Sequence, residues 1–377
     1  MTVYRADHVG SLLRPPEVLA AHAAHAEGRL SLEELRRIED AAIDAALVMQ
    51  KEAGLPIFSD GEYRRATWAG DFTDAVDGYV PGTQPVEFRW RRDDGTVVQG
   101  GPNTTGGRVI GEKLRQRTRL TGHESAYLKQ HAPGPFKITM PAPSYIVARG
   151  YRPEVTDPVY GSRAAVLADV ARIVNAEIKA LVDEGVTYIQ LDNPHYPDYL
   201  DAGRQAQWRA LGVDPDKAIL EDVEADNAAI DGIDHSRVTL AMHFCRGNGG
   251  QAGWHTEGAY DPIAEPVFGG LKVDRLLLEY DSARAGGFEP LRFVPAGKQV
   301  VLGLITTKAG LLEPEELLLR RIEEASRFIP LENLAISPQC GFASVMAGNP
   351  LSPEEQRRKL ELVVSVAKKV WGGTTSA

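Results

Sequence analysis

Two residues that bind soft metal ions stand two positions apart in the segment His243-Phe244-Cys245. Because successive side chains of a strand point to opposite faces, this imidazole and this thiol would lie on the same side. Glu279 ends the next predicted strand, and Cys340 follows the last one. A histidine, two cysteines and a carboxylate favour zinc over magnesium or calcium. The spacing therefore predicts one zinc site, against the alternative that both cysteines are buried apolar filler.

Such a site suits the alkylation of a thiol. A substrate thiol has a pKa of roughly 8.5, and a metal that binds it keeps it as a thiolate at neutral pH. The thiolate then attacks an electrophilic carbon and forms a thioether. A non-catalytic barrel with a structural zinc is the alternative, but structural sites usually carry thiolates in short CxxC pairs, and the sequence has none.

Eight short apolar runs alternate with amphipathic stretches of helical period, which indicates a parallel sheet with helical crossovers. Eight such units favour a single (β/α)8 TIM-type barrel over an open, doubly wound sheet, and no GxGxxG follows an early strand. The expected strands cover residues 7–11, 56–62, 136–140, 187–192, 238–243, 275–280, 299–305 and 333–337.

Helix boundaries are marked by capping residues. Ser31 and Glu34 form a capping box that opens a helix to about Ala53, and further helices are expected over 163–183, 313–328 and 353–371. Residues 69–135 interrupt the alternation. They contain a predicted hairpin, 86–92 with 96–99, and are interpreted as an insertion between the second and third strands of one domain, 1–377.

Composition excludes several classes of function. The chain has 377 residues, a formal net charge of −10 and two cysteines, which argues against nucleic acid or an anionic membrane as partner. The few cysteines and the absence of a leader or a long apolar run predict a reduced, cytoplasmic protein with no membrane span. The oligomeric state, a homo-oligomer included, stays open.

Six motifs together resemble the cobalamin-independent methionine synthase family, in particular its catalytic barrel and short stand-alone relatives. The resemblance covers most of the chain and implies a zinc-bearing (β/α)8 barrel that alkylates a thiol, usually homocysteine. The motifs are HVGSLLRP at 8–15, SDGEYRR at 59–65, IQLDNP at 189–194, MHFCRGN at 242–248, LEYDSARAG at 278–286 and ISPQCGFAS at 336–344.

The resemblance also implies roles for individual residues. The zinc ligands would be His243, Cys245, Glu279 and Cys340. Homocysteine would be bound by Val9, Gly10, Ser11, Glu62, Asp192 and Asp198, the carboxylates holding its ammonium group. From the residues alone, Glu62 could instead pair with Arg64 or Arg65, and Asp192 could cap the turn that follows it.

The sequence departs from the family on the donor side. Thr306, Thr307 and Lys308 stand where long enzymes have a proton-donating histidine, and MPAPSY replaces an aromatic platform, with Tyr145 as a partial substitute. Asp192 and Lys308 are the expected catalytic residues. The first expectation is a zinc-dependent homocysteine S-methyltransferase whose methyl donor is unassigned.

The second expectation is an epoxyalkane:coenzyme M transferase of similar architecture. The sulfonate of coenzyme M would require a cation near zinc. Arg14, Arg246 and Lys308 are the candidates for that role.

Overall fold

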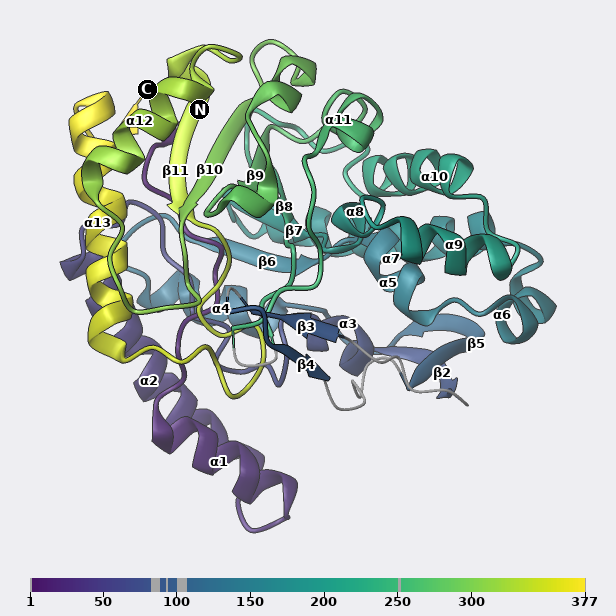
Figure 1. Ribbon diagram of the computed structural model, residues 1–377. Helices are drawn as coiled ribbons and strands as arrows, with labels where there is room; N and C mark the ends of the chain where they lie inside the picture. The colour runs from purple at the N-terminus through teal and green to yellow at the C-terminus, as the bar shows by residue number, and fades with distance from the viewer. Residues whose placement is uncertain (1, 83–88, 93, 100–106, 250–251, 377) are drawn as a thin grey trace.

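A sheet of six parallel strands forms the centre of the computed structural model, which describes residues 2–82, 89–92, 94–99, 107–249 and 252–376 (Figure 1). The strands lie in sequence order across the sheet, and all but the first residue of β10 are buried. Buried, apolar strands joined by helices are typical of a parallel sheet covered on both sides. They are β6 (Lys137–Pro141), β7 (Tyr188–Asp192), β8 (Thr239–Phe244), β9 (Arg275–Glu279), β10 (Gln299–Ile305) and β11 (Leu334–Pro338).

Two further segments extend this order at its two edges. Ala6 forms a parallel bridge to Ile336 of β11, and Phe58 forms one to Phe136 beside β6. Between these segments side chains and one end of the backbone make the contacts. His8 Nε2 lies 3.1 Å from the Ile57 carbonyl oxygen, the Ser59 hydroxyl donates to the Gly10 carbonyl at 2.6 Å, and the Leu12 N–H donates to the Gly61 carbonyl at 3.0 Å. The predicted TIM-type barrel is thus confirmed, with a seam rather than a continuous ladder between its first two segments.

The seam corrects two of the eight predicted strands. Residues 7–11 and 56–62 are irregular, the second segment ending in a turn, and each has a single bridge residue beside or within it. Gly10, Gly61 and Glu62 have φ values of 140°, 69° and 59°, which a paired strand cannot accommodate. The other six predictions agree with β6 to β11 to within one or two residues.

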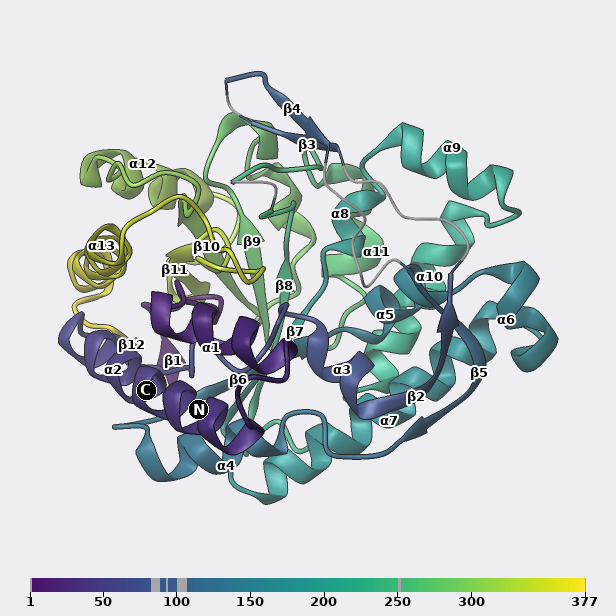
Figure 2. The ribbon, with the colours of Figure 1, turned by 90° about the horizontal axis from the view of Figure 1, so that it is seen from below.

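Helices surround the strands, as Figure 2 shows for α2, α4, α7 and α13. α2 (Leu32–Glu52) opens with the predicted capping box of Ser31 and Glu34, and α13 (Pro353–Trp371) opens with one of Ser352 and Glu355. The remaining helices are α1 (Pro16–Ala26), α3 (Gly70–Ala75), α4 (Gly122–His131), α5 (Pro143–Gly150), α6 (Pro153–Tyr160), α7 (Arg163–Asp183), α8 (His195–Asp198), α9 (Ala202–Ala210), α10 (Pro215–Ala228), α11 (Asp261–Phe268), α12 (Glu315–Ala325) and the 3-10 turns η1 (Ala283–Ala285), η2 (Glu289–Phe293) and η3 (Leu331–Asn333).

Residues 69–135 carry two small antiparallel pairs besides α3 and α4. β2 (Val76–Pro81) pairs with β5 (Arg108–Gln116), and β3 (Arg89–Arg91) pairs with β4 (Val97–Gln99). The β3–β4 pair is the described part of the predicted hairpin, of which residues 86–88 and 93 lie outside the described ranges. Figure 1 shows it on the side to which β10 and β11 point.

The β3–β4 hairpin is docked on the loop that follows β8. Arg91 and Trp254 exchange both backbone hydrogen bonds, at 2.7 and 2.8 Å. A Cβ added to Gly249 would lie 2.9 Å from the Trp90 ring, and one added to Gly253 would lie 2.6 Å from Trp90 Cβ. The glycines therefore leave the room that the Trp90 side chain occupies.

The barrel interior is filled by side chains from all its strands. Tyr4, Val9, Ile57, Tyr188, Ala241, Leu277, Val301 and Ala335 form one buried apolar cluster. Beside it Asp7 accepts hydrogen bonds from Lys137 Nζ at 2.6 Å and from the Tyr188 hydroxyl at 2.7 Å. Burying these charges is tolerated because each is paired.

Two further features complete the fold. β1 (Val3–Tyr4) pairs with β12 (Thr375–Ser376), so the two ends of the described chain meet. No helix within the described ranges combines the length and apolar character needed to cross a membrane.

Candidate active site

The four predicted metal ligands meet at the carboxyl ends of three strands. His243 lies in β8 and Cys245 just beyond it, Glu279 ends β9, and Cys340 follows β11 by two residues. One ligand atom from each residue lies within 4.8 Å of the others, and the two Sγ atoms are 3.5 Å apart. Barrel enzymes place their catalytic groups at this face.

The cluster has unused hydrogen-bonding capacity. Both ring nitrogens of His243 and both carboxylate oxygens of Glu279 are buried and lack a hydrogen-bond partner within the described residues. Buried polar atoms in native proteins nearly always have partners, so four orphaned atoms in one place require an explanation. An ion ligated by these atoms supplies one, and a His, Cys, Cys, Glu donor set fits zinc.

The electrostatics of the cluster reflect its burial. Burial, followed by the charge of Cys340, raises the pKa of Glu279 to about 7. The hydrogen bond between the two thiols lowers the pKa of Cys340 and raises that of Cys245. Without a compensating cation, therefore, the four groups cannot all be in the deprotonated form that a metal requires.

A small cavity opens on this cluster. Two of the predicted substrate-binding carboxylates, Glu62 and Asp192, line it together with the two thiols. Its lining consists of Val9, Ser11, Glu62, Trp68, Asp192, Pro194, His243, Cys245, Cys340 and Ser344.

Glu62 lines this cavity and has one carboxylate oxygen without a hydrogen-bond partner among the described residues. Its Oε1 accepts a hydrogen bond from Thr139 Oγ1 at 2.8 Å, whereas its buried Oε2 has no partner among the described residues. The alternative ion pairs are weak or absent: Arg65 Nη1 lies 3.9 Å from Glu62 while its Nε pairs with Asp71 at 2.7 Å, and Arg64 pairs with Asp40. The carboxylate is thus available for a ligand.

The backbone at Glu62 is strained and held from several sides. Its φ of 59° is rare for a residue other than glycine, and such strain persists where the surroundings enforce it. Arg14 Nη2 donates to the Glu62 carbonyl at 2.8 Å, and Asp60 Oδ1 accepts from its N–H at 2.9 Å. A Cβ on Gly10 would lie 3.2 Å from Glu62 Oε1 and 2.9 Å from Thr139 Cγ2, so the glycine permits this approach.

Asp192 ends β7 directly beside the cluster. Burial raises its pKa to about 7, and the charge of His243 opposes the shift. Gln190 donates a hydrogen bond to Asp192 Oδ1 at 2.9 Å. The turn after β7 is capped instead by Asn193, whose Oδ1 accepts from the N–H of His195 at 2.9 Å.

Lys308 is not among the residues that line the cavity. Its Nζ donates to the Gly247 carbonyl at 2.8 Å and to Asn248 Oδ1 at 3.0 Å. Both acceptors belong to the loop that begins with Cys245. Lys308 therefore fixes the position of this loop.

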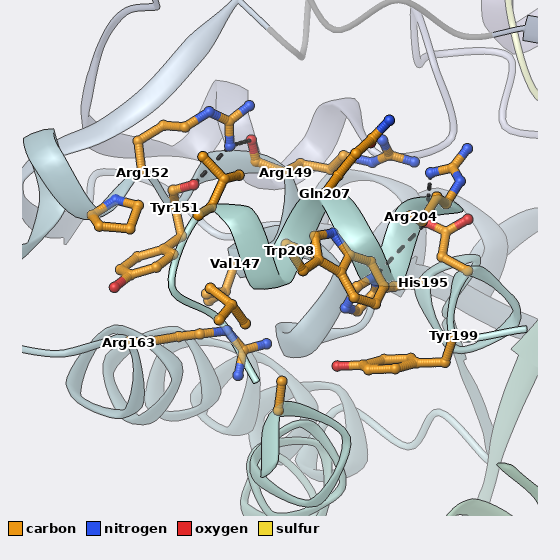
Figure 3. Close-up of a pocket in the computed structure, with 16 residues that line it drawn as sticks. Val147, Arg149, Tyr151, Arg152, Arg163, His195, Tyr199, Arg204, Gln207 and Trp208 are labelled. Atoms are coloured by element: carbon orange, nitrogen blue, oxygen red, sulfur yellow. Dashed lines mark hydrogen bonds and ion pairs between the residues drawn. The ribbon is translucent and has the colours of Figure 1, made fainter. Parts of the chain in front are cut away.

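Asp198 does not join the other predicted substrate residues. It lines a separate, larger cavity, and its carboxylate lies 3.1 Å from Arg204 and 3.5 Å from His255. Burial raises its pKa, but the charge of Arg204 and the hydrogen bond with His195 outweigh burial and hold the pKa well below its usual range. Asp198 and Glu62 therefore line different cavities, of which Figure 3 shows the one that Asp198 lines, and the role of Asp198 in substrate binding stays a prediction.

Sequence reasoning missed residues that act through others. Thr139 orients Glu62, and the Ser11 carbonyl accepts from Phe342 N–H at 2.9 Å, tying the first segment to the Cys340 loop. A Cβ on Gly341 would lie 1.9 Å from Ser11 Oγ. Such contacts join distant parts of the chain and leave no local pattern, although Gly341 directly follows a predicted ligand.

Comparison with known proteins gives a consistent result. A family model described as "Cobalamin-independent synthase, Catalytic domain" matches residues 5–369. The uncharacterized protein YxjG of Bacillus subtilis (strain 168) is 40% identical over 373 residues, which cover 98% of this chain and 95% of that protein. A methionine synthase of Saccharolobus solfataricus is 24% identical over 364 residues, 93% and 95% of the two chains.

A solved structure has the same overall architecture. A protein from Listeria monocytogenes assigned as a vitamin-B12 independent methionine synthase superimposes with a TM-score of 0.75 at 30% sequence identity. The superposition covers 98% of each chain.

Proposed function

Because this chain belongs to the family of cobalamin-independent synthase catalytic domains, we propose that it is a zinc-dependent homocysteine S-methyltransferase that forms methionine. The observation that carries the proposal is the juxtaposition of a His, Cys, Cys, Glu cluster with two carboxylates around one cavity. The cluster would take the thiol end of the substrate, and the carboxylates of Glu62 and Asp192 would take its ammonium end.

The donor set supports zinc. The ion would be held by His243, Cys245, Glu279 and Cys340. As a Lewis acid it would lower the pKa of a substrate thiol. The cavity that reaches the cluster argues against a closed structural site, in which protein ligands fill the coordination sphere.

The protein side chains bind and orient the amino acid. The free Oε2 of Glu62 and the carboxylate of Asp192 accept hydrogen bonds from the ammonium group. These hydrogen bonds are strong because donor and acceptor are both charged. Lys308 is a positioning residue: through Gly247 and Asn248 it fixes the loop of Cys245. The reaction is a displacement at the methyl carbon by the thiol sulfur. Holding the thiol in the correct orientation toward that carbon supplies much of the rate acceleration.

Coenzyme M fits the cavity less well than homocysteine. Its sulfonate needs a cation, yet Arg14 donates to the backbone carbonyls of Glu62 and Arg65, and Arg246 donates to that of Gly258. None of the three candidate cations lines the cavity. The carboxylates of Glu62 and Asp192 would also repel a sulfonate.

Calorimetric titration of the zinc-loaded protein tests the proposal. We expect homocysteine to bind with release of a proton, and Glu62→Gln to weaken it by about tenfold or more, since a hydrogen bond to a charged group contributes about 1.5–3 kcal/mol. 4-Mercaptobutyrate, which lacks only the amino group, should bind equally to both forms.

Glu33→Gln is the matched control, because Glu33 is exposed on α2. Binding of coenzyme M but not homocysteine would replace the proposal by the alternative transferase. Equal weakening of homocysteine and 4-mercaptobutyrate in Glu62→Gln would show that Glu62 does not hold the ammonium group.

A further inference from the structure

Two neighbouring side chains in the barrel interior hold the two carboxylates of the candidate active site. Thr139 of β6 and Gln190 of β7 are partners in register, so their side chains lie on the same face of the sheet. The Thr139 hydroxyl donates a hydrogen bond to Glu62 Oε1 at 2.8 Å. The Gln190 amide donates one to Asp192 Oδ1 at 2.9 Å. Each carboxylate is thus fixed through one oxygen by an uncharged side chain.

The second oxygen of each carboxylate remains available to a ligand. Glu62 Oε2 is buried without a hydrogen-bond partner, and among the described residues Asp192 accepts a side-chain hydrogen bond at Oδ1 alone. Both residues line the cavity that opens on the metal cluster. Two anionic acceptors therefore share one small space, with one unused oxygen on each.

The orientation of the Gln190 amide is set by a buried lysine, which Asp7 holds at 2.6 Å. Lys137 Nζ lies 3.0 Å from Gln190 Oε1, and because an ammonium group can only donate, the amide oxygen must face it. The amide nitrogen then donates to the Val9 carbonyl at 2.7 Å and to Asp192 at 2.9 Å. Both amide hydrogens are used, so the lysine determines which atom Gln190 presents to Asp192.

Thr139 is held in the same way by a buried arginine. Arg65 Nη1 donates to Thr139 Oγ1 at 3.1 Å, so the single hydrogen of this hydroxyl is left for Glu62. Glu124 and Asp71 neutralise the guanidinium group, each with a carboxylate oxygen 2.7 Å from Arg65 Nε. Two separate chains of contacts therefore have the same order: a buried cation, a neutral side chain and a cavity carboxylate.

The neutral side chain between cation and carboxylate has an electrostatic consequence. A lysine or arginine in direct contact would occupy a carboxylate oxygen and act as its counter-ion. Lys137 instead reaches Asp192 only through an amide, and Arg65 Nη1 lies 3.9 Å from Glu62 Oε1, beyond hydrogen-bonding distance. The carboxylates are oriented without a cation hydrogen-bonded to them, so the ammonium group of a ligand can take that place.

We propose that Gln190, with its amide fixed by Lys137, is the positioning residue that makes the site specific for a thiol carrying an amino group, because it holds Asp192 as an acceptor for ammonium. Thr139 has the equivalent role for Glu62. Neither Gln190 nor Thr139 lines the cavity, so both act through the carboxylates. The identity of the thiol, homocysteine, rests on the proposed function.

Calorimetric titration of the zinc-loaded protein with homocysteine and with 4-mercaptobutyrate tests the proposal. The ratio of the two dissociation constants measures the preference for the amino group. Gln190→Met keeps the length of the side chain, and Thr139→Val keeps its shape, but both remove the hydrogen bond to a carboxylate. We expect each variant to lower the preference about tenfold, with 4-mercaptobutyrate affinity within about threefold of the unmodified protein.

Double variants show whether the effect passes through the carboxylates. In an Asp192→Asn background, Gln190→Met should change the preference by less than about twofold. Thr139→Val should likewise have less than about a twofold effect in a Glu62→Gln background. A purely structural role would leave the same loss with and without the charged partner, and that result would refute the proposal.

Lys137→Met tests the cation at the far end of the chain of contacts. In this variant Asp7 keeps the Tyr188 hydroxyl at 2.7 Å and Arg275 at 3.4 Å. The Gln190 amide is then able to turn its oxygen toward Asp192, so the preference should fall at least about threefold. An unchanged preference in folded Lys137→Met would show that the lysine does not set the amide orientation.

Gln205→Met is the matched control, because Gln205 on α9 donates to the Tyr199 carbonyl and does not line the cavity. Its preference should stay within about twofold of the unmodified protein, and urea unfolding of each variant checks the fold. An unchanged preference in both Gln190→Met and Thr139→Val, or equal weakening of both thiols, would overturn this proposal alone. Absence of homocysteine binding to the unmodified protein would instead refute the proposed function.

Discussion

The sulfur atoms of Cys245 and Cys340 lie 3.5 Å apart although the two residues are 95 positions apart in the chain. One follows β8 and the other follows β11, so the barrel itself brings them together. Neither local pairing nor a shared loop contributes to this contact. The two cysteines of the chain therefore depend on the completed fold for any joint function.

Replacing either cysteine by serine should abolish stoichiometric zinc. We expect one zinc per chain in protein purified without chelator, and less than a tenth of that in Cys245→Ser or Cys340→Ser, because a hydroxyl is a poor zinc ligand. Metal analysis of the purified proteins, with circular dichroism for the fold, measures this. Ser344→Ala, beside Cys340, is the control. A full zinc complement in both cysteine variants would disprove the ligand assignment.

The buried ion pair of Asp7 and Lys137 should make stability fall in acid. The lysine holds the pKa of Asp7 at about 2, below its unfolded value near 4, although burial acts in the opposite direction. The carboxylate therefore stabilises the fold fully above about pH 4, and loses about 1 kcal/mol of this contribution by pH 3. Urea unfolding between pH 5 and pH 3 measures the loss.

Asp7→Asn isolates this contribution. The variant should be less stable at pH 5 by about 3 kcal/mol or more, because Lys137 keeps a buried charge without its partner. The difference from the unmodified protein should shrink as the pH falls toward 3. Asp183→Asn, at an exposed position, should show neither effect. A difference that stays constant with pH would contradict the linkage to Asp7.

Gly10→Ala should impair both stability and homocysteine binding. The new methyl group would lie 2.9 Å from Thr139 Cγ2 and 3.2 Å from Glu62 Oε1, at a φ of 140°. Overpacking and backbone strain together cost about 2–4 kcal/mol. Gly212→Ala, with positive φ and open space, should show the backbone cost alone.

A second substitution separates the steric contact from the strain. Thr139→Ser removes Cγ2 but keeps the hydroxyl that binds Glu62, so in the Gly10→Ala background it should restore part of the homocysteine affinity. Urea unfolding and calorimetry report the two effects separately. An unchanged affinity in the double variant would mean that Thr139 Cγ2 is not the obstructing group.

Trp90→Ala should loosen the β3–β4 hairpin from the loop after β8 without unfolding the barrel. The indole packs against Gly249 and Gly253, and its loss leaves the two Arg91–Trp254 backbone hydrogen bonds unsupported. Amide exchange at Trp254 should accelerate at least about tenfold, while amides of β9 and β10 stay protected. Trp371→Ala, far along the chain on α13, is the control. Unchanged exchange at Trp254 would show that Trp90 does not hold the hairpin.

Regular elements could be predicted from the sequence because their signals are local. α7 and α13 have the predicted bounds, 163–183 and 353–371, since Ser162 and Ser352 cap their first turns. Buried apolar runs likewise located β6 to β11. The irregular course of residues 7–11 and 56–62 could not be predicted in this way. The positive φ values at Gly10, Gly61 and Glu62 accompany contacts between these two segments, which lie far apart in the sequence.

The site was predictable to a similar extent. The positions of His243, Cys245, Glu279 and Cys340 follow from strand ends that meet in any closed barrel. The placement of Asp198 does not, because it lies on α8 and its orientation is set by Arg204 and His255, which come from two other segments. The cavity that Asp198 lines could not be predicted either, since its walls come from six helices, α5 to α10.

The seam between the first two barrel segments has a consequence for the order in which the barrel folds during synthesis. The partners of the first segment lie near the other end of the chain: Val3 and Tyr4 pair with Ser376 and Thr375, and Ala6 pairs with Ile336. During synthesis the strands β6 to β10 can add one after another, whereas the first segment waits for residues 336, 375 and 376. Closing so long a loop is slow. Ser11 therefore reaches Phe342 and the Cys340 loop only after nearly the whole chain has emerged, and the nascent protein carries no assembled thiol site.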